Sequence, residues 1–556
     1  MYSSGLFKTK RAISRAAGIA VVIIIIVIVA AAGYAALSVS TKTNSSRSSI
    51  SVQTTTTSSS SLTSSSSQIQ SGNQTVTMAV ANPINNLDPV DSNNPDNLNL
   101  DLAIYDNLVR FNSNMQIVPD LATSWILSAN QTTWTFQLRQ GVRFSDGTSL
   151  NATAVAINLN RDRNATGGFS HSSLFTMINS VGVLTPYTIS ITTAYPFAAL
   201  LNNLAHPSGG IVSPVAIEKW GKAVSAHPDG SGPWEVQSLS PTSQVTFVRN
   251  PYYWGNTTDV SEIRVLIVPD SSTRLSMLQS GQADIIEGVP PSSASSIAGT
   301  TGLRLVVTPS ELERYIGFNV NIKPFNDVRV RQALNYAVNR SALIQVVYNG
   351  YAQKPTSPAA PNVTGYSPVV PFYHYNLTKA KELLASAGYP NGFNATMWTG
   401  NSQTSILLAQ AVQSMLAKVG VQLSIQSYPF GTEIGKLSTS ENQSQMQMYQ
   451  LRWFPSSGDA YWVLWPLFDA AAFPPAGFNY GFFNNATINN LINTGLNTIN
   501  GRQTYFTEAQ NLIVQQAPWI FLVVEDQLTG MQQSITGVQV WPANTIYFNN
   551  VAVQQP

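Results

Sequence analysis

The segment RYIGFNVNIKPFNDVRVRQALNYAVNRSALI, from Arg314 to Ile344, carries the clearest structural pattern in the sequence. Asp327 is followed by apolar residues at helical spacing, so we predict that it caps a helix that continues through Asn339. One face of this helix is apolar and is predicted to pack in a core: Val330, Ala333, Leu334, Ala337 and Val338.

Strand and helix patterns alternate on both sides of this segment. Apolar residues alternate with polar ones from Trp134 to Leu138, which predicts a half-buried strand. Short helices are predicted at Ser271 to Ser280 and at Gln403 to Lys418, the second closed by Gly420. Val421 to Tyr428 alternates again as a strand. Together these patterns predict an α/β chain with mixed sheets.

Four further segments complete a recognisable series, and they stand in the same order as in a known family. The Arg314 segment resembles a signature of the family 5 extracellular solute-binding proteins. These are the oligopeptide, dipeptide and nickel type that serves ATP-binding cassette (ABC) importers. The others resemble further motifs of that family: PDLATSWILSANQTTWTFQLRQGVRFSDGTSLNATAV (Pro119 to Val155), GSGPWEVQSLSPTSQVTFVRNPYYWG (Gly230 to Gly255), RLSMLQSGQADII (Arg274 to Ile286) and YNLTKAKELLASAGYPNGF (Tyr375 to Phe393). The resemblance covers nearly all of residues 75–550.

This resemblance implies a two-lobe fold like that of periplasmic binding proteins, of type II, in the large cluster with an extra subdomain. Lobe I is expected at residues 73–312, lobe II at 313–525, and a return to lobe I at 526–556. By analogy the chain crosses between lobes near Glu313 to Asn319 and returns near Val523 to Gln527. The lobes are expected to close on a solute held in the cleft.

The N-terminal region predicts attachment to a membrane. Residues 1–18 are basic, residues 19–37 form an apolar run that contains no charge, and residues 38–72 are rich in serine and threonine. The run is long enough to span a bilayer, and the positive-inside rule puts the N-terminus in the cytoplasm and the binding body outside. The Ser/Thr-rich segment is predicted to be a disordered linker. Recurrent Asn-x-Ser/Thr sequons agree with an extracellular glycoprotein.

The segment Arg11-Ala12-Ile13-Ser14 resembles the processing site of archaeal pilin-like signal peptides. Cleavage after Ala12 would leave the apolar run in place. With or without this cleavage, the sequence predicts a single-pass protein of the cell membrane.

Composition excludes several classes of function. Only 10% of residues are charged, and six of the 29 Lys and Arg precede Asp88, the first acidic residue. The rest of the chain therefore holds 23 basic residues against 27 acidic ones. A mildly acidic body argues against nucleic-acid binding, which requires a basic face. The scarcity of charge suggests an acidic habitat, because amides and hydroxyls do not titrate.

We find no pattern for covalent chemistry, a cofactor or a metal. There is no cysteine, the four histidines are scattered without zinc-site spacing, and neither a phosphate-binding GxxxxGK nor a GxSxG motif occurs. We therefore predict that the chain is not an enzyme. A surface-anchored hydrolase and an adhesion or surface-layer protein remain the alternatives, and the absence of repeats weighs against the second.

The candidate ligand residues lie mostly in the aromatic stretch RWFPSSGDAYWVLWPLF, from Arg452 to Phe468. In the resembling peptide binders this region carries Trp-x-x-Asp, whose Trp packs on the ligand and whose Asp pairs with the peptide amino terminus. That implies ligand contact by Trp453 and places Ser456 at the amine-binding position. Serine cannot neutralise an ammonium, which weakens the peptide interpretation. Asp459 matches a downstream Asp and is also typical of a structural turn.

Some members of the family carry oligosaccharides, whose rings stack on aromatic faces. The residues that suit that role are Trp453, Phe454, Tyr461 and Trp462, so peptide and sugar both stay open, with sugar slightly favoured. The same stretch has helical spacing, and Trp465 and Phe468 are expected in the core instead. The resemblance also brings Asn82 and Tyr105 toward the cleft.

The sequence therefore predicts a membrane-tethered extracytoplasmic receptor of an ABC importer. It is expected to capture oligosaccharides or oligopeptides by lobe closure and to deliver them to the permease.

Overall fold

The structure is a computed structural model that describes residues 74–92, 94–455 and 457–554. The predicted basic segment, transmembrane helix and linker, at 1–18, 19–37 and 38–72, lie outside the described residues. Among the helices that the structure describes, none combines the length and the apolar character needed to cross a bilayer.

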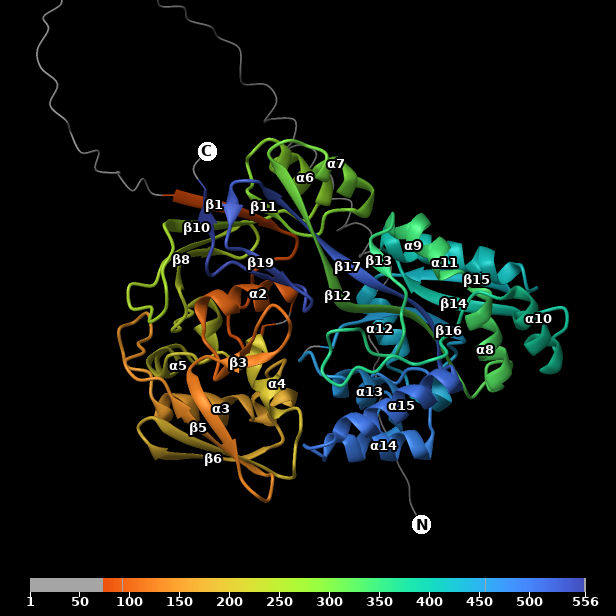
Figure 1. Cartoon of the computed structure of the whole chain (residues 1–556), viewed down its shortest axis with the longest axis horizontal. Helices are drawn as coiled ribbons and strands as arrows, with labels where there is room; N and C mark the ends of the chain where they lie inside the picture. Colours follow the sequence, from red (N-terminus) through yellow and green to blue (C-terminus); the bar gives the residue numbers. More distant parts are fainter. Residues whose placement is uncertain (1–73, 93, 456, 555–556) are drawn as a thin grey trace, which may run out of the picture. The chain divides into compact units, whose positions relative to one another are not determined.

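One large mixed sheet runs through the described residues (Figure 1). Its strand order is β15-β14-β16-β12-β17-β11-β1-β10-β9-β8, and β13 pairs with β17. The bounds are β1 Gln74–Val80, β8 Trp234–Ser240, β9 Gln244–Arg249, β10 Val260–Ile267, β11 Ile285–Ile286, β12 Leu303–Phe318, β13 Ala352–Gln353, β14 Asn394–Gly400, β15 Gln422–Tyr428, β16 Met448–Trp453 and β17 Trp519–Gln532. Below, the first half means the side with β8, β9, β10, β1 and β11, and the second half means the side with β16, β14 and β15.

The two longest strands, β12 and β17, connect the halves and run antiparallel to each other (Figure 1). Residues 303–309 of β12 pair with 526–532 of β17, and residues 313–317 pair with 519–524. The register shifts between Pro309 and Glu313, so the ladder is interrupted where the strands pass from one half to the other. This arrangement agrees with two crossing strands; the lobe boundaries at 312 and 525 stay a prediction.

Helices of the second half pack on its sheet around a core that includes Phe318, Leu334 and Met448. The helix predicted from Asp327 forms, with the Asp327 carboxylate accepting a hydrogen bond from the Arg329 amide, but its predicted end at Asn339 is wrong. The helix ends at Ala337, because the Asn339 side chain accepts from the Ala342 amide and begins a new helix. The other predicted elements are confirmed: β5 (Thr133–Leu138), α6 (Ser271–Gln279), α11 (Gln403–Ala417) and β15.

The first half carries a separate antiparallel sheet of order β4-β5-β7-β6. Three two-stranded sheets, β2-β3, β18-β21 and β19-β20, complete the described strands. Their bounds are β2 Val109–Phe111, β3 Ile117–Pro119, β4 Ala122–Leu127, β5 Thr133–Leu138, β6 Ile178–Thr185, β7 Thr188–Thr193, β18 Ile535–Thr536, β19 Gln539–Trp541, β20 Thr545–Tyr547 and β21 Ala552–Val553.

The α-helices are α2 Pro95–Ile104, α3 Ala152–Asp162, α4 Leu200–Ala205, α5 Pro214–Trp220, α6 Ser271–Gln279, α7 Ala294–Ala298, α8 Val328–Ala337, α9 Arg340–Tyr348, α10 Leu377–Ser386, α11 Gln403–Ala417, α12 Phe430–Leu437, α13 Tyr461–Phe468, α14 Ala486–Leu496 and α15 Arg502–Gln516. Of these, α2 borders the candidate site. It begins after the cap Asn94, whose side chain accepts from the Asn97 amide, and it has proline in its first turn.

Candidate binding site

A cavity of about 770 Å³ lies where the two halves of the sheet meet. On the first half, its walls include α2, the loop after β2, the loop between β9 and β10, and residues within 541–550. The crossing strands β12 and β17 contribute Ser310, Leu312 and residues 525–527, and the second half contributes Phe430, Arg452 and Phe454. This volume is in the range of pockets that enclose a small solute.

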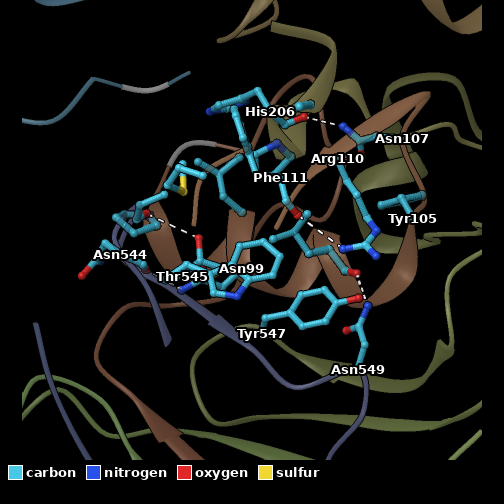
Figure 2. Close-up of a pocket in the computed structure, with 18 of the residues that line it drawn as sticks. Asn99, Tyr105, Asn107, Arg110, Phe111, His206, Asn544, Thr545, Tyr547 and Asn549 are labelled. Carbon is cyan, nitrogen blue, oxygen red and sulfur yellow. Dashed lines mark hydrogen bonds between the residues drawn. The ribbon is translucent and has the colours of Figure 1, made fainter. Parts of the chain in front are cut away.

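Polar side chains of the first-half wall are held by hydrogen bonds to backbone carbonyls (Figure 2). Asn107 donates to the carbonyls of Leu204 and His206, at 2.9 and 2.6 Å. Asn99 donates to Asn544 O at 3.3 Å. These bonds fix the orientation of the wall before any solute arrives, which reduces the ordering needed on binding.

Aromatic rings and amides dominate the same wall. Tyr547 stacks on Trp541 with ring centroids 4.6 Å apart, and the Arg139 guanidinium lies 4.1 Å above the Trp254 ring. Seven asparagines line the cavity: Asn94, Asn99, Asn107, Asn256, Asn544, Asn549 and Asn550. Such a lining offers stacking faces and uncharged hydrogen-bonding groups.

Two buried carboxyls beside Arg110 stabilise the wall itself. Asp106 accepts from the Ser231 hydroxyl at 2.9 Å and the Trp254 indole at 2.7 Å, and burial raises the pKa of Asp106 to about 6. Asp120 accepts from the Asn107 amide at 2.9 Å, and burial raises its pKa well above the ordinary value, with the Asp106 charge adding to the effect. Arg110 belongs to the same group, since its Nε lies 3.8 Å from Asp120 Oδ1.

The second-half wall presents Arg452, which lies opposite Arg314 in the pairing of β16 with β12. Arg314 has a carboxylate partner, since its Nε lies 2.6 Å from Glu525 Oε1, and Glu525 also accepts from the Tyr348 hydroxyl at 3.0 Å. Arg452 is exposed at the cavity, and its side chain makes no hydrogen bond or ion pair with any residue that the structure describes. Its guanidinium offers a donor fork suited to a carboxylate.

Of the predicted site residues, Phe454 and Tyr105 line the cavity. Tyr105 is buried and donates its hydroxyl to Leu87 O at 2.8 Å, so its ring forms part of the wall. Trp453 is not among the lining residues; its indole donates to Trp462 O at 2.7 Å and its ring packs 5.3 Å from Phe478.

Asp459, Tyr461, Trp462 and Asn82 do not line the cavity either. Asp459 is completely buried, pairs with Arg502 at 2.5 Å and accepts from the Tyr461 amide. The rings of Tyr461 and Trp462 pack against the core of the first half, and Asn82 bonds to Asp96. Ser456 lies outside the described residues. Contact of any of these residues with a solute stays a prediction.

The expectation of core positions for Trp465 and Phe468 agrees with the structure, because Phe468 is fully buried and Trp465 packs against the same cluster. Sequence reasoning missed Arg452, Arg110, Phe430 and Tyr547. Arg452 was visible as the cation that opens the aromatic stretch, in a chain that is only 10% charged. Arg110, Phe430 and Tyr547 belong to no sequence motif, because they come together only when distant parts of the chain fold.

Comparison with known proteins decides the family. The family model for bacterial extracellular solute-binding proteins, family 5, matches residues 116–474. The chain belongs to this family. It is 35% identical over 478 residues to the glutathione-binding protein GsiB of Pectobacterium atrosepticum, covering 85% of this chain and 93% of that protein. The Salmonella typhimurium GsiB is 34% identical over 480 residues, with 85% and 94% covered.

Solved structures agree with this family. HbpA2 from Haemophilus parasuis superposes with a TM-score of 0.77 at 25% identity, over 87% of this chain and all of that one. DppA from Helicobacter pylori, a periplasmic binding protein in complex with the peptide STSA, gives 0.73 at 26% identity, with 86% and 98% covered. The family resemblance found in the sequence is therefore confirmed, and membership assigns the chain to extracellular solute-binding proteins rather than enzymes. Among the described residues, no group of three or more His, Cys, Asp or Glu is placed to hold a metal ion.

Proposed function

We propose that this protein captures short peptides, or peptide-like amino-acid derivatives that carry a carboxylate, and delivers them to the permease of an ABC importer. The observation that carries the proposal is Arg452, a guanidinium exposed at the cavity without a partner among the described residues. A carboxylate held between Arg452 and the opposite wall would contact both halves of the sheet. Such a ligand stabilises the state in which the halves are close together.

Charge on both walls supports an anionic group in the solute. Arg110 and Arg139 line the first half, and Arg452 lines the second. The nearby carboxyls are engaged: Glu525 with Arg314, and Asp106 with Ser231 and Trp254. The names of relatives agree, because GsiB is a glutathione-binding protein and DppA was solved with a peptide. Glutathione carries two carboxylates and an ammonium, which suits a cavity with more than one guanidinium.

An oligosaccharide is the second candidate, favoured by the stacked Trp541 and Tyr547 and by the asparagines of the lining. Aromatic faces and amides bind sugar rings and hydroxyls without needing charge. This reading assigns no role to the unpartnered Arg452, so we place it second. In either case the predicted helix at residues 19–37 is proposed to hold the binding body at the outer face of the membrane.

The test is binding of defined solutes to purified full-length protein in detergent. Glutathione, alanine tripeptide, cellobiose and maltotriose are compared by thermal shift and calorimetry, since a ligand that binds only the folded state raises the melting temperature. We expect the peptide-like solutes to bind, and we expect Arg452→Gln to lower their affinity at least tenfold. Arg143→Gln serves as the control, because Arg143 is exposed and does not line the cavity. Binding of the sugars alone would favour the second candidate, and binding of none would contradict solute capture.

A further inference from the structure

Glu311 is a buried carboxyl without a hydrogen-bonding partner at the passage between the two halves. It lies on β12 inside the register shift between Pro309 and Glu313, and its side chain is 0% exposed. Among the described residues it is the one carboxyl whose two oxygens are both buried and both without a hydrogen bond. Buried polar groups are normally hydrogen-bonded, so a pair of orphaned oxygens needs a physical explanation.

The surroundings of Glu311 place it directly behind the wall of the cavity. A methyl group added to Gly458 would lie 3.8 Å from Glu311 Oε1, 3.1 Å from Met115 Cε and 3.6 Å from Phe111 Cζ. Met115 and Phe111 both line the cavity, as do the chain neighbours Ser310 and Leu312. The carboxyl is therefore next to cavity-lining side chains of the first half and to the Gly458 loop of the second half. Met115 is one of these neighbours, and methionine side chains adapt their rotamers easily.

Within the part of the chain that the structure describes, no charge close to Glu311 compensates for its burial. Burial alone raises the pKa of Glu311 to about 8, and no neighbouring cation or anion contributes to the shift. The side chain is consequently neutral at neutral pH, because an isolated carboxylate in an apolar site is strongly disfavoured. A cation placed alongside it would reverse this balance and favour the ionised form.

The other acidic residues at the cavity are already engaged. Glu525 pairs with Arg314, Asp120 accepts from the Asn107 amide, and Asp526 accepts from the Gln353 amide at 3.2 Å. Asp106 is held by Ser231 and Trp254. Each of these groups therefore already accepts a hydrogen bond from the protein, whereas the Glu311 carboxyl accepts none from the described residues.

We propose that Glu311 accepts the primary ammonium of the solute, and that it releases its proton to solvent when the solute binds. This inference rests on the proposed function and narrows the substrate class to solutes that carry an ammonium as well as a carboxylate. Met115 moves aside, the carboxyl O–H bond breaks, its proton goes to the buffer, and the ammonium keeps its own protons. The solute then spans from Arg452 on one half to Glu311 on the crossing strand.

Calorimetry at pH 6.5 in phosphate and in imidazole buffer tests this proposal, because the two buffers differ in ionisation enthalpy and so report the protons released. The probes are glutathione and alanine tripeptide, each with a free and an N-acetylated amino group, on full-length protein. We expect close to one proton released per bound molecule with the free amine, and none with the acetylated form. The acetylated probes should bind at least tenfold more weakly to the wild type.

The Glu311→Gln variant should lose proton release and the preference for the free amine, while its affinity for the acetylated probes stays within about threefold. Glu433→Gln is the matched control, since Glu433 is also a buried glutamate with an unpartnered oxygen but does not line the cavity or flank its lining. Proton release that persists in Glu311→Gln, or wild-type binding without it, would overturn the inference and leave the proposed function standing. If Glu311→Gln does not fold, the wild-type comparison of free and acetylated probes decides alone. If the wild type binds no probe, the proposed function and this inference both fail.

Discussion

Arg314 and Arg452 lie directly opposite each other on β12 and β16, and only Arg314 has a carboxylate partner. Adjacent like charges on a sheet repel, so the pair is unfavourable unless something anionic is near. Glu525 neutralises the buried member of the pair, and the exposed member faces the cavity. The Arg452 guanidinium therefore supplies one positive charge to the site, and the pairing of β16 with β12 fixes the position of Arg452.

Replacing Arg452 with glutamine should lower the affinity for carboxylate solutes by about 10- to 100-fold, because a hydrogen bond to a charged group contributes about 1.5–3 kcal/mol. The free energy of unfolding should stay constant or rise slightly, since the repulsion with Arg314 is relieved. Calorimetric titration and urea unfolding measure the two effects separately. An equal loss of affinity in Arg143→Gln would show that the effect is not specific to the cavity.

Replacing Glu525 with glutamine should destabilise the protein by about 3–5 kcal/mol, because Arg314 is buried and would lose its counter-charge. The control is Glu262→Gln on β10, whose partner Arg264 is exposed, where less than about 1 kcal/mol is expected. Urea unfolding of both variants gives the comparison. Similar small losses in the two variants would contradict a structural role for the Arg314–Glu525 pair.

The sequence predicted local elements well where local signals define them. Asp327 begins a helix as its cap, the alternation at Trp134 gives a strand, and Gly420 adopts a positive φ of 82° after α11. The end of α8 was misjudged, because the apolar face continues past the point where the Asn339 side chain starts the next helix. Periodicity reports which residues are buried and does not report how many helices share a face.

The site was predicted less well, and the reason is geometric. The aromatic stretch reaches the cavity through Phe454, whereas Trp453 contacts Trp462 and Phe478 instead. Neighbours on a strand point to opposite faces, and nothing in the sequence alone says which of them meets the opening. Arg110 and Tyr547 join the cavity across more than 400 residues of chain, a proximity that no spacing rule reveals.

Substitution of Asp459 distinguishes a structural role of this residue from a role in ligand binding. Its carboxylate is completely buried against Arg502, so Asp459→Asn should destabilise the protein by about 3–5 kcal/mol. Because the residue does not line the cavity, solute affinity of the folded fraction should change less than about threefold. Thermal unfolding and calorimetry below the unfolding transition measure the two quantities. A large drop in affinity with stability intact would support Asp459 as a ligand residue.

Stability should fall as the pH rises from about 4.5 to about 8, and Glu311 should supply part of that slope. Burial raises the pKa of Glu311 to about 8 in the folded protein, whereas the unfolded chain has the ordinary glutamate value of 4.5. Between these values the folded protein holds a proton that the unfolded chain has lost. The stabilisation is thus fully present below about pH 4.5 and is lost toward pH 8, at about 1.4 kcal/mol per pH unit for this single group. Glu311→Gln should flatten the slope by that amount in urea unfolding at pH 5, 6 and 7. An unchanged slope would mean that the folded protein ionises Glu311 without its solute.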